Sequence, residues 1–244
     1  MMQTNGWVRP WLLMVSIAVL GCMATSAWAT DSAESLERLY QQKQAQDAAK
    51  AKQSAVGKSF RDCPECPEML RLPTGMAMGK YEVTQGQWRA VMGSNPSFFS
   101  SCGDGCPVEQ VSWNDAQDYI ERLNQRTGKR YRLPTEIEWF AACQAGSSHE
   151  YCGSDDIDAV AWYGSNSAGR THPAGQKQAN AWGLYDMSGN VWEWTSSCEV
   201  GYCSRRVFRG GSWGFGLAVV RSAFRSGLYP THRYDFSGFR LAHD

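Results

Sequence analysis

The sequence has no excess of charge of either sign: 24 basic and 24 acidic residues leave no basic footprint for nucleic acid. It also lacks a bilayer-length hydrophobic run, because the apolar stretch Trp11–Leu20 is too short to cross a membrane comfortably. No P-loop or Rossmann glycine pattern and no internal repeat is present. None of its histidines has a metal-binding spacing: His149, His172, His232 and His243. These absences argue against nucleic-acid partners, a membrane span, a nucleotide site and a metal site readable from histidine spacing.

What is present at the start of the chain is a pattern typical of a secretory signal peptide in residues 1–29. Arg9 precedes the apolar stretch, and the tripeptide 27–29 (Ala-Trp-Ala) offers a small-x-small cleavage site before Thr30. An alternative is lipoprotein processing before Cys22. We therefore expect an exported, periplasmic protein that is soluble after cleavage near Ala29. In this interpretation, membrane contact is limited to the signal peptide or to a lipid on Cys22.

Export changes how the cysteines are interpreted. The chain has nine cysteines, and removal of Cys22 with the leader leaves eight, an even number in an oxidising compartment. They fall into four close pairs, which we predict to be disulfides that pin loops: Cys63/Cys66, Cys102/Cys106, Cys143/Cys152 and Cys198/Cys203. About 105 connectivities are formally possible, so this pairing rests on proximity. Zinc at Cys63 and Cys66 is a weak alternative, because no second motif of that spacing exists.

The composition divides the chain into three parts. After the signal peptide, residues 30–58 are polar and alanine-rich, which predicts a helical or flexible spacer. Residues 59–244 have the length of one domain. Within it, helix-capping patterns at Thr84, Ser112 and Thr135 predict three short helices, which glycines end at 93, 128 and 146. The remainder is rich in glycine and tryptophan, so we expect an α+β fold with much coil.

Several motifs together resemble the sulfatase-modifying-factor family, which includes the formylglycine-generating enzymes. They include RLPTEIEW (132–139), GLYDMSGNVWEW (183–194), RVFRGGSW (206–213) and GFRLA (238–242), in the family's order. The resemblance covers about residues 64–243. It implies a variant of the C-type-lectin-like fold with little regular secondary structure.

The chain departs from the family at its best-known chemistry. Formylglycine generators use two thiols that bind copper, and the resemblance places these positions at Phe215 and Val220. No cysteine follows Cys203, and copper(I) needs soft sulfur ligands. We therefore expect neither copper binding nor formylglycine generation.

The resemblance also implies a structural calcium site. Its ligands would be the side chains of Asp186 and Glu193 and the carbonyls of Gly189 and Val191. Calcium prefers several oxygen ligands in flexible geometry, which this turn offers. The alternative is an Asx-type turn in which Glu193 pairs with an arginine.

A groove is implied around the positions of the missing thiols. Its candidate residues are Trp192, Arg209, Ser212, Trp213, Phe215, Val220, Arg221 and Arg225. The arginines could receive a carboxylate or a peptide backbone. Ion pairs with glutamates of the domain explain them equally well. Ser212 has no histidine near it in the sequence, so we predict no serine nucleophile.

Three functional hypotheses follow. The first is an exported pseudoenzyme that acts as an accessory or binding protein for a polypeptide partner. The second is an oxidoreductase of different chemistry acting on a peptide-derived substrate, because the chain also resembles family members required for siderophore maturation (the pyoverdine type), or a residual protein-modifying oxidase. The third, glycan binding, rests only on fold analogy.

Overall fold

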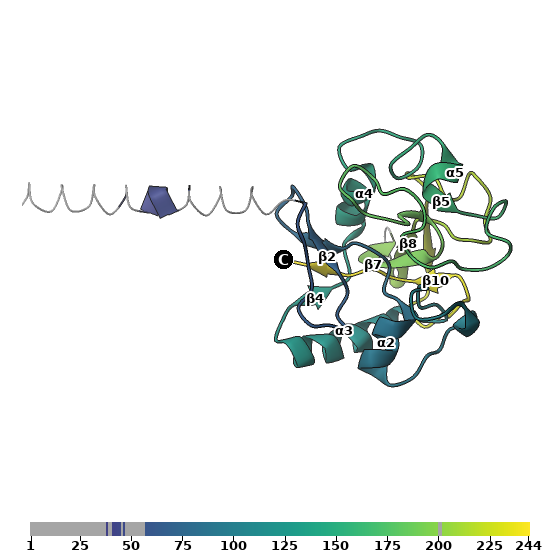
Figure 1. Cartoon of the computed structure of the whole chain (residues 1–244), viewed down its shortest axis with the longest axis horizontal. Coiled ribbons are helices and arrows are strands. Elements are labelled where there is room, and N and C mark those ends of the chain that lie inside the picture. Colours follow the sequence, from purple (N-terminus) through teal and green to yellow (C-terminus); the bar gives the residue numbers. More distant parts are fainter. Residues whose placement is uncertain (1–37, 39–40, 45, 47–56, 200–201) are drawn as a thin grey trace, which may run out of the picture. The chain divides into compact units, whose positions relative to one another are not determined.

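The computed structural model describes residues 38, 41–44, 46, 57–199 and 202–244 (Figure 1). The predicted signal peptide, the alternative at Cys22 and most of the predicted spacer lie outside these residues. Residues 38, 41–44 and 46 are helical and exposed. Ala55–Asp244 forms one compact unit, which is described by itself below. Within the described part of the chain, every helix is too short or too polar to traverse a lipid bilayer.

The three helices predicted from capping patterns are present. They are α2 (Gln85–Met92), α3 (Trp113–Thr127) and α4 (Glu136–Gln144), and each begins at a capping box in which a hydroxyl and an acid or amide side chain bond each other's backbone N–H. The first two end at the predicted glycines. In contrast, α4 ends one residue earlier than predicted, at Ala145, which itself takes a left-handed conformation with φ 48°. Two one-turn helices, η1 (Ser100–Cys102) and α5 (Ile157–Val160), are too short to leave a periodic pattern.

Two main sheets and a strand pair complete the domain. The first sheet is antiparallel, in the order β1 (Ser59–Phe60), β2 (Met69–Arg71), β3 (Ala77–Gly79), β11 (Ala242–His243) and β4 (Tyr131–Arg132). The second has the order β10 (Ser237–Gly238), β7 (Trp192–Glu199), β8 (Tyr202–Arg209) and β9 (Arg225–Leu228). The pair is β5 (Ala161–Trp162) with β6 (Ser188–Gly189).

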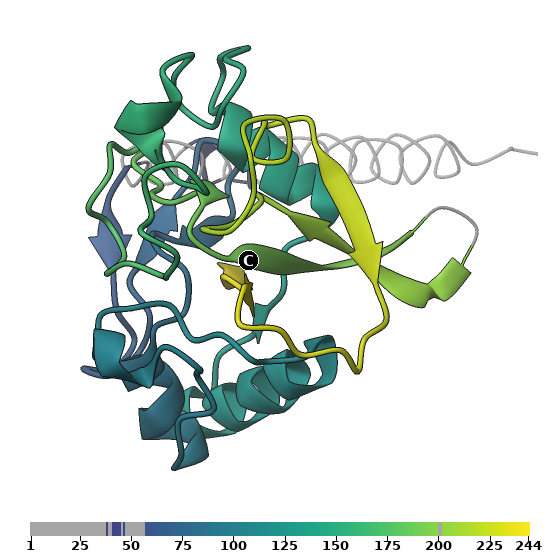
Figure 2. The same ribbon diagram turned by 90° about the vertical axis from the view of Figure 1, so that its right-hand side faces the viewer.

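The β7–β8 hairpin lies between α4 on one side and the α2–α3 pair on the other (Figures 1 and 2). Trp192, Trp194 and Phe208 of the hairpin pack with α2 and α3 in the largest cluster of buried residues. Trp139 of α4 belongs to a second cluster, with Leu184. The hairpin therefore packs in the first cluster and is linked to the second by the hydrogen bond from Trp139 to Glu193. The predicted mixed fold of helices and sheets with much coil is confirmed.

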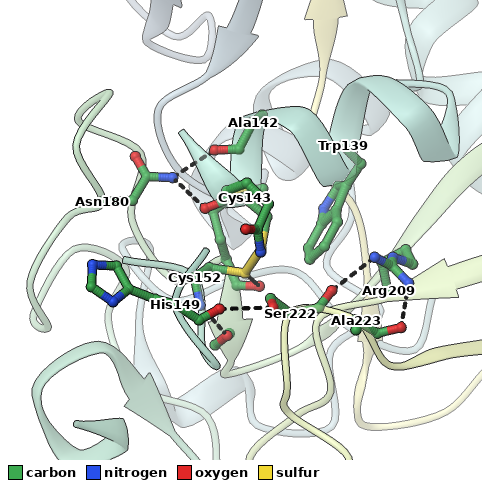
Figure 3. Close-up of a disulfide and its surroundings, with 12 residues drawn as sticks. Trp139, Ala142, Cys143, His149, Cys152, Asn180, Arg209, Ser222 and Ala223 are labelled. Carbon is green, nitrogen blue, oxygen red and sulfur yellow. Dashed lines mark hydrogen bonds between the residues drawn. A yellow bond between two sulfur atoms is a disulfide. The ribbon is translucent and has the colours of Figure 1, made fainter. Parts of the chain in front are cut away.

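All four predicted disulfides are present: Cys63–Cys66, Cys102–Cys106, Cys143–Cys152 and Cys198–Cys203. The zinc alternative at Cys63 and Cys66 is wrong, because those two sulfurs are bonded to each other. Figure 3 shows the third bridge, which fastens the loop after α4 to the helix. Asn180 donates to the carbonyls of Ala142 and Cys143 at the same place.

Candidate functional site

The centre of the segment 180–213 is a buried ion pair. Arg240 donates from Nε and Nη2 to the two carboxylate oxygens of Glu193, at 2.7 Å each, and both side chains are fully buried. The indole of Trp139 donates to the same carboxylate at 2.6 Å. Arg240 also donates to the carbonyls of Gly79 and Tyr185. The arginine therefore connects three distant stretches of chain, as the alternative interpretation of Glu193 expected.

Two further buried carboxyls face this pair. Glu82 accepts hydrogen bonds from the side chain of Asn190 and the backbone of Val191. Asp186 accepts one from the backbone of Gly175 at 2.7 Å. Burial raises the pKa of Asp186 to about 6 and, together with the charges of Asp186 and Glu193, holds the pKa of Glu82 well above its ordinary value. Burial would lower the pKa of Arg240, but the charges of these carboxyls outweigh it and raise that pKa.

The four predicted calcium ligands lie in the eight-residue stretch from Asp186 to the start of β7, whose backbone is unusual. Asp186, Gly189 and Asn190 all have positive φ, and a Cβ on Gly189 would lie 2.2 Å from the carbonyl oxygen of Trp162. One oxygen of Asp186 is buried without a hydrogen-bond partner among the described residues, as an ion ligand would be before the ion binds. Both oxygens of Glu193 already accept hydrogen bonds, so this carboxylate would have to share an oxygen between Arg240 and the ion.

Calcium at this turn stays a prediction. In the part of the chain that the structure describes, no three His, Cys, Asp or Glu side chains form a cluster able to hold a metal. The predicted site has only two acidic side chains, however, and takes its other ligands from carbonyls. The four histidines have separate surroundings: His149 bonds Asp155, His172 stacks on Trp162, His232 lies between two tyrosines and His243 packs against Tyr131.

The two positions of the missing thiols are filled by apolar packing. Phe215 packs edge-on against Trp192 and Phe236 in the main core cluster. Val220 is fully buried and belongs to a different cluster, with Tyr151 and Tyr163. Every cysteine from residue 57 onward in the described chain is in a disulfide. These residues therefore offer no thiolate for copper.

The predicted groove residues divide into an aromatic group and an arginine group. Trp192 is buried and stacks on Phe208. Trp213 is half-buried, packs edge-on against Phe99 and donates to the carbonyl of Asp235. Ser212 is fully buried, and its hydroxyl has no partner among the described residues. No described histidine bonds it.

The arginines are held in ion pairs of different burial. Arg225 forms a two-pronged pair with Glu136, and Arg221 pairs with Glu150 at the surface. Arg209 is 3% exposed and donates mainly to backbone carbonyls, among them that of Ser222 (Figure 3). Burial lowers its pKa to about 10. The expected ion pairs with glutamate therefore exist for Arg221 and Arg225, while the guanidinium of Arg209 lies 3.7 Å from Glu136.

Sequence reasoning missed Glu109, which holds an exposed aromatic loop. Its carboxylate accepts from the backbone N–H groups of Phe98 and Phe99, at 3.0 and 2.8 Å, and the residue is fully buried. Burial raises its pKa to about 7, and nearby Asp235 acts in the same direction. A glutamate between Val108 and Gln110 has no local motif, so nothing in the sequence indicates this role.

Comparison with known proteins agrees with this geometry. The family described as "Sulfatase-modifying factor enzyme 1-like domain" matches residues 33–244. The chain is 34% identical to chaperone protein LppX of Paenibacillus barcinonensis, over 56% of this chain and 68% of that protein. It is 32% identical to inactive C-alpha-formylglycine-generating enzyme 2 of Bos taurus, over 56% of this chain and half of that protein.

Among solved structures, PvdO from Pseudomonas aeruginosa is similar to this chain, with a TM-score of 0.66 and 26% identity. The similarity covers 78% of this chain and 98% of PvdO. The sequence motifs, the family match and the shared architecture agree: this chain belongs to the sulfatase-modifying factor enzyme 1-like family.

Proposed function

We propose that this chain is an exported accessory protein that binds a polypeptide partner and does not perform the thiol chemistry of formylglycine generation. The fold is proposed to be the C-type-lectin-like variant of the family. The observation that carries the proposal is the packing of Phe215 and Val220. Both lie where the resemblance places the thiols, and each contributes to a different apolar cluster.

A surface suited to a polypeptide lies beside these positions. We define the aromatic cluster as six rings in two groups, which the hydrogen bond from Trp213 to the Asp235 carbonyl brings together. Phe98, Phe99 and Trp213 form one group of ring contacts, and Phe215, Tyr234 and Phe236 form the other. Phe98 is 67% exposed, and Leu217 next to the cluster in the chain is 51% exposed. Adjacent exposed aromatic and aliphatic side chains are typical of protein-interaction surfaces.

Two further observations support the proposal. The relatives include a protein named as a chaperone and one named as an inactive formylglycine-generating enzyme. The four disulfides in the described chain suit an oxidising compartment, which supports export.

The chemical half of the proposal is tested with a sulfatase peptide that contains the cysteine to be oxidised, supplied with copper and oxygen. We expect no oxygen uptake and no mass change of the peptide. Formylglycine in the peptide would overturn the proposal.

The binding half is tested by replacing Phe98 with the photoreactive residue p-benzoylphenylalanine and irradiating cells of the native host. We expect one dominant protein adduct, identified by mass spectrometry. The same residue at Asp118, exposed on α3, is the matched control and should give no such adduct. Equal labelling from both positions, or none from Phe98, would contradict binding at the aromatic cluster.

A second candidate is oxidation of a peptide-derived substrate by other chemistry, which the resemblance to family members required for siderophore maturation implies. This candidate predicts that deletion of the protein causes a peptide product of the host to accumulate in a form heavier by one pair of hydrogens. It also predicts that the purified protein converts that product. Accumulation without conversion by the purified protein would favour the accessory role.

A further inference from the structure

A small pocket lies beside α4. It has a volume of about 290 Å³ and is lined by Glu136, Ile137, Phe140, Arg209 and Ala223, which we call the α4 pocket. Figure 3 shows the local arrangement: Arg209 reaches from the end of β8 toward the carbonyls of Ser222 and Ala223, beside Trp139 of the helix. Helix, strand end and following loop thus form its walls.

The rim of the α4 pocket is apolar and exposed. Ile137 is 82% exposed and Phe140, one turn along the same helix, is 39% exposed. Phe224, next in the chain to Ala223, is 38% exposed. These side chains contribute little to the core, whereas Trp139 of the same helix is fully buried. Exposed large apolar side chains grouped around a hollow are typical of a binding site.

The floor of the α4 pocket has more positive than negative charge. Both carboxylate oxygens of Glu136 accept hydrogen bonds from the guanidinium of Arg225, at 2.7 and 2.8 Å. The guanidinium of Arg209 lies 3.7 Å from that carboxylate, beyond hydrogen-bond distance. Two arginines therefore share one glutamate, which leaves one net positive charge.

In the described residues of α4 and the β7–β8 hairpin, every other carboxylate pairs with another arginine. Glu138, on the same first turn of α4, pairs with Arg132 at 2.8 Å. Glu199, on the hairpin, pairs with Arg205 at 3.1 Å. Arg209 donates to the neutral carbonyls of Ser222, Ala223 and Phe224, and its Nε is buried without a hydrogen-bond partner among the described residues. A buried guanidinium balanced mainly by carbonyls favours a ligand that brings a negative charge.

We propose that the α4 pocket binds a polypeptide segment in which a large apolar residue is followed directly by an acidic residue. The apolar side chain lies against Ile137 and Phe140. The carboxylate lies at Arg225 and supplies the charge that Arg209 and Arg225 lack. This inference rests on the proposed polypeptide-binding function and adds a second contact site with a stated ligand chemistry.

The test uses the purified protein and three acetylated, C-terminally amidated peptides. The probe is Ac-Gly-Phe-Glu-NH2, and the controls are Ac-Gly-Phe-Gln-NH2, without the charge, and Ac-Gly-Ser-Glu-NH2, without the ring. Binding is followed by NMR shifts of the isotope-labelled methyl group of Ile137. We expect saturable shifts with the probe and at least about tenfold weaker binding of either control. No shift with the probe, or equal shifts with all three peptides, would overturn the inference.

Variants separate the pocket from a general effect. Arg225→Gln frees Glu136 to pair with Arg209, so the net charge disappears and we expect about tenfold weaker binding of the probe. Arg61→Gln removes an arginine of similar exposure, 43% against 40% for Arg225, from an ion pair with Glu68 outside the pocket, and should leave binding unchanged. Equal losses in the two variants would contradict the proposal. The result is independent of the photocrosslink at Phe98, so failure of the aromatic cluster and failure of the α4 pocket are distinguishable.

Discussion

Arg240 and Glu193 form a fully buried, two-pronged ion pair, with both nitrogen–oxygen distances at 2.7 Å. Glu193 belongs to β7, whereas Arg240 lies 47 residues further along the chain, between β10 and β11. The pair therefore fixes the end of the chain to the hairpin, and through Trp139 to α4.

Removing the cation from this pair should be strongly destabilising. Arg240→Met leaves Glu193 buried beside Glu82 and Asp186 without a compensating charge, which is expected to cost about 3–5 kcal/mol of the free energy of unfolding. Urea denaturation measures the change. The matched control is Arg221→Met, in an exposed pair with Glu150, where a loss below about 1 kcal/mol is expected. Similar losses in the two variants would contradict this account.

Glu109 should make stability depend on pH. Burial raises the pKa of its carboxyl from 4.5 to about 7 in the folded protein. The folded state therefore holds this proton more tightly than the unfolded state, so Glu109 lowers stability as pH rises from about 4.5 to 7, by on the order of 3 kcal/mol.

Glu109→Gln removes that titration but leaves one of the N–H groups of Phe98 and Phe99 without its acceptor. We expect the free energy of unfolding of the wild-type protein to fall relative to that of the variant as pH rises through this interval. Urea midpoints at a series of pH values measure the difference. Parallel pH profiles for the two proteins would rule out this role for Glu109.

Val220 packs where a side chain on Gly211 would lie. Gly211 has φ 71°, and a Cβ there would be 2.5 Å from the Cγ1 of Val220. Gly211→Ala is expected to cost more than about 1 kcal/mol, and Val220→Ala about 1–2 kcal/mol. The double variant should be less destabilised than the sum, since loss of Cγ1 relieves part of the clash. The relief is partial because the Val219 carbonyl oxygen lies 3.0 Å from the same point. Strict additivity in thermal or urea denaturation would contradict the contact.

The four disulfides should differ in their resistance to reduction. Cys143 and Cys152 are buried, whereas Cys203 is exposed at the hairpin end. In the native protein, dithiothreitol is expected to open Cys198–Cys203 before Cys143–Cys152, as followed by alkylation and mass spectrometry. Loss of the larger Cys143–Cys152 loop should also lower the melting temperature more. First reduction of the buried bridge would show that the loop after α4 opens in the native state.

Calcium at Asp186, Gly189, Val191 and Glu193 is testable through Asp186, whose free buried oxygen is the ligand most available to an ion. If the prediction is right, the chelator EGTA lowers the melting temperature of the wild-type protein, and Asp186→Ala abolishes that shift. An EGTA shift that is absent, or unchanged in the variant, would contradict the site.

The sequence by itself determined the features that depend on near neighbours in the chain. Capping residues fixed the starts of α2, α3 and α4 because each hydroxyl bonds a backbone group three residues away. The disulfide pairs followed from their short spacing. The missing thiols at Phe215 and Val220 followed from aligned motifs and needed no coordinates.

Only the tertiary structure decided the features made by distant contacts. Arg240 is the partner of Glu193. Phe215 and Val220 pack in separate clusters. Arg209 and Arg225 both lie beside Glu136. Each of these outcomes depends on which segments pack together, and a buried charge takes whichever partner that packing brings within reach. Local sequence does not specify which distant segments pack together, so the sequence identified the residues but not their partners.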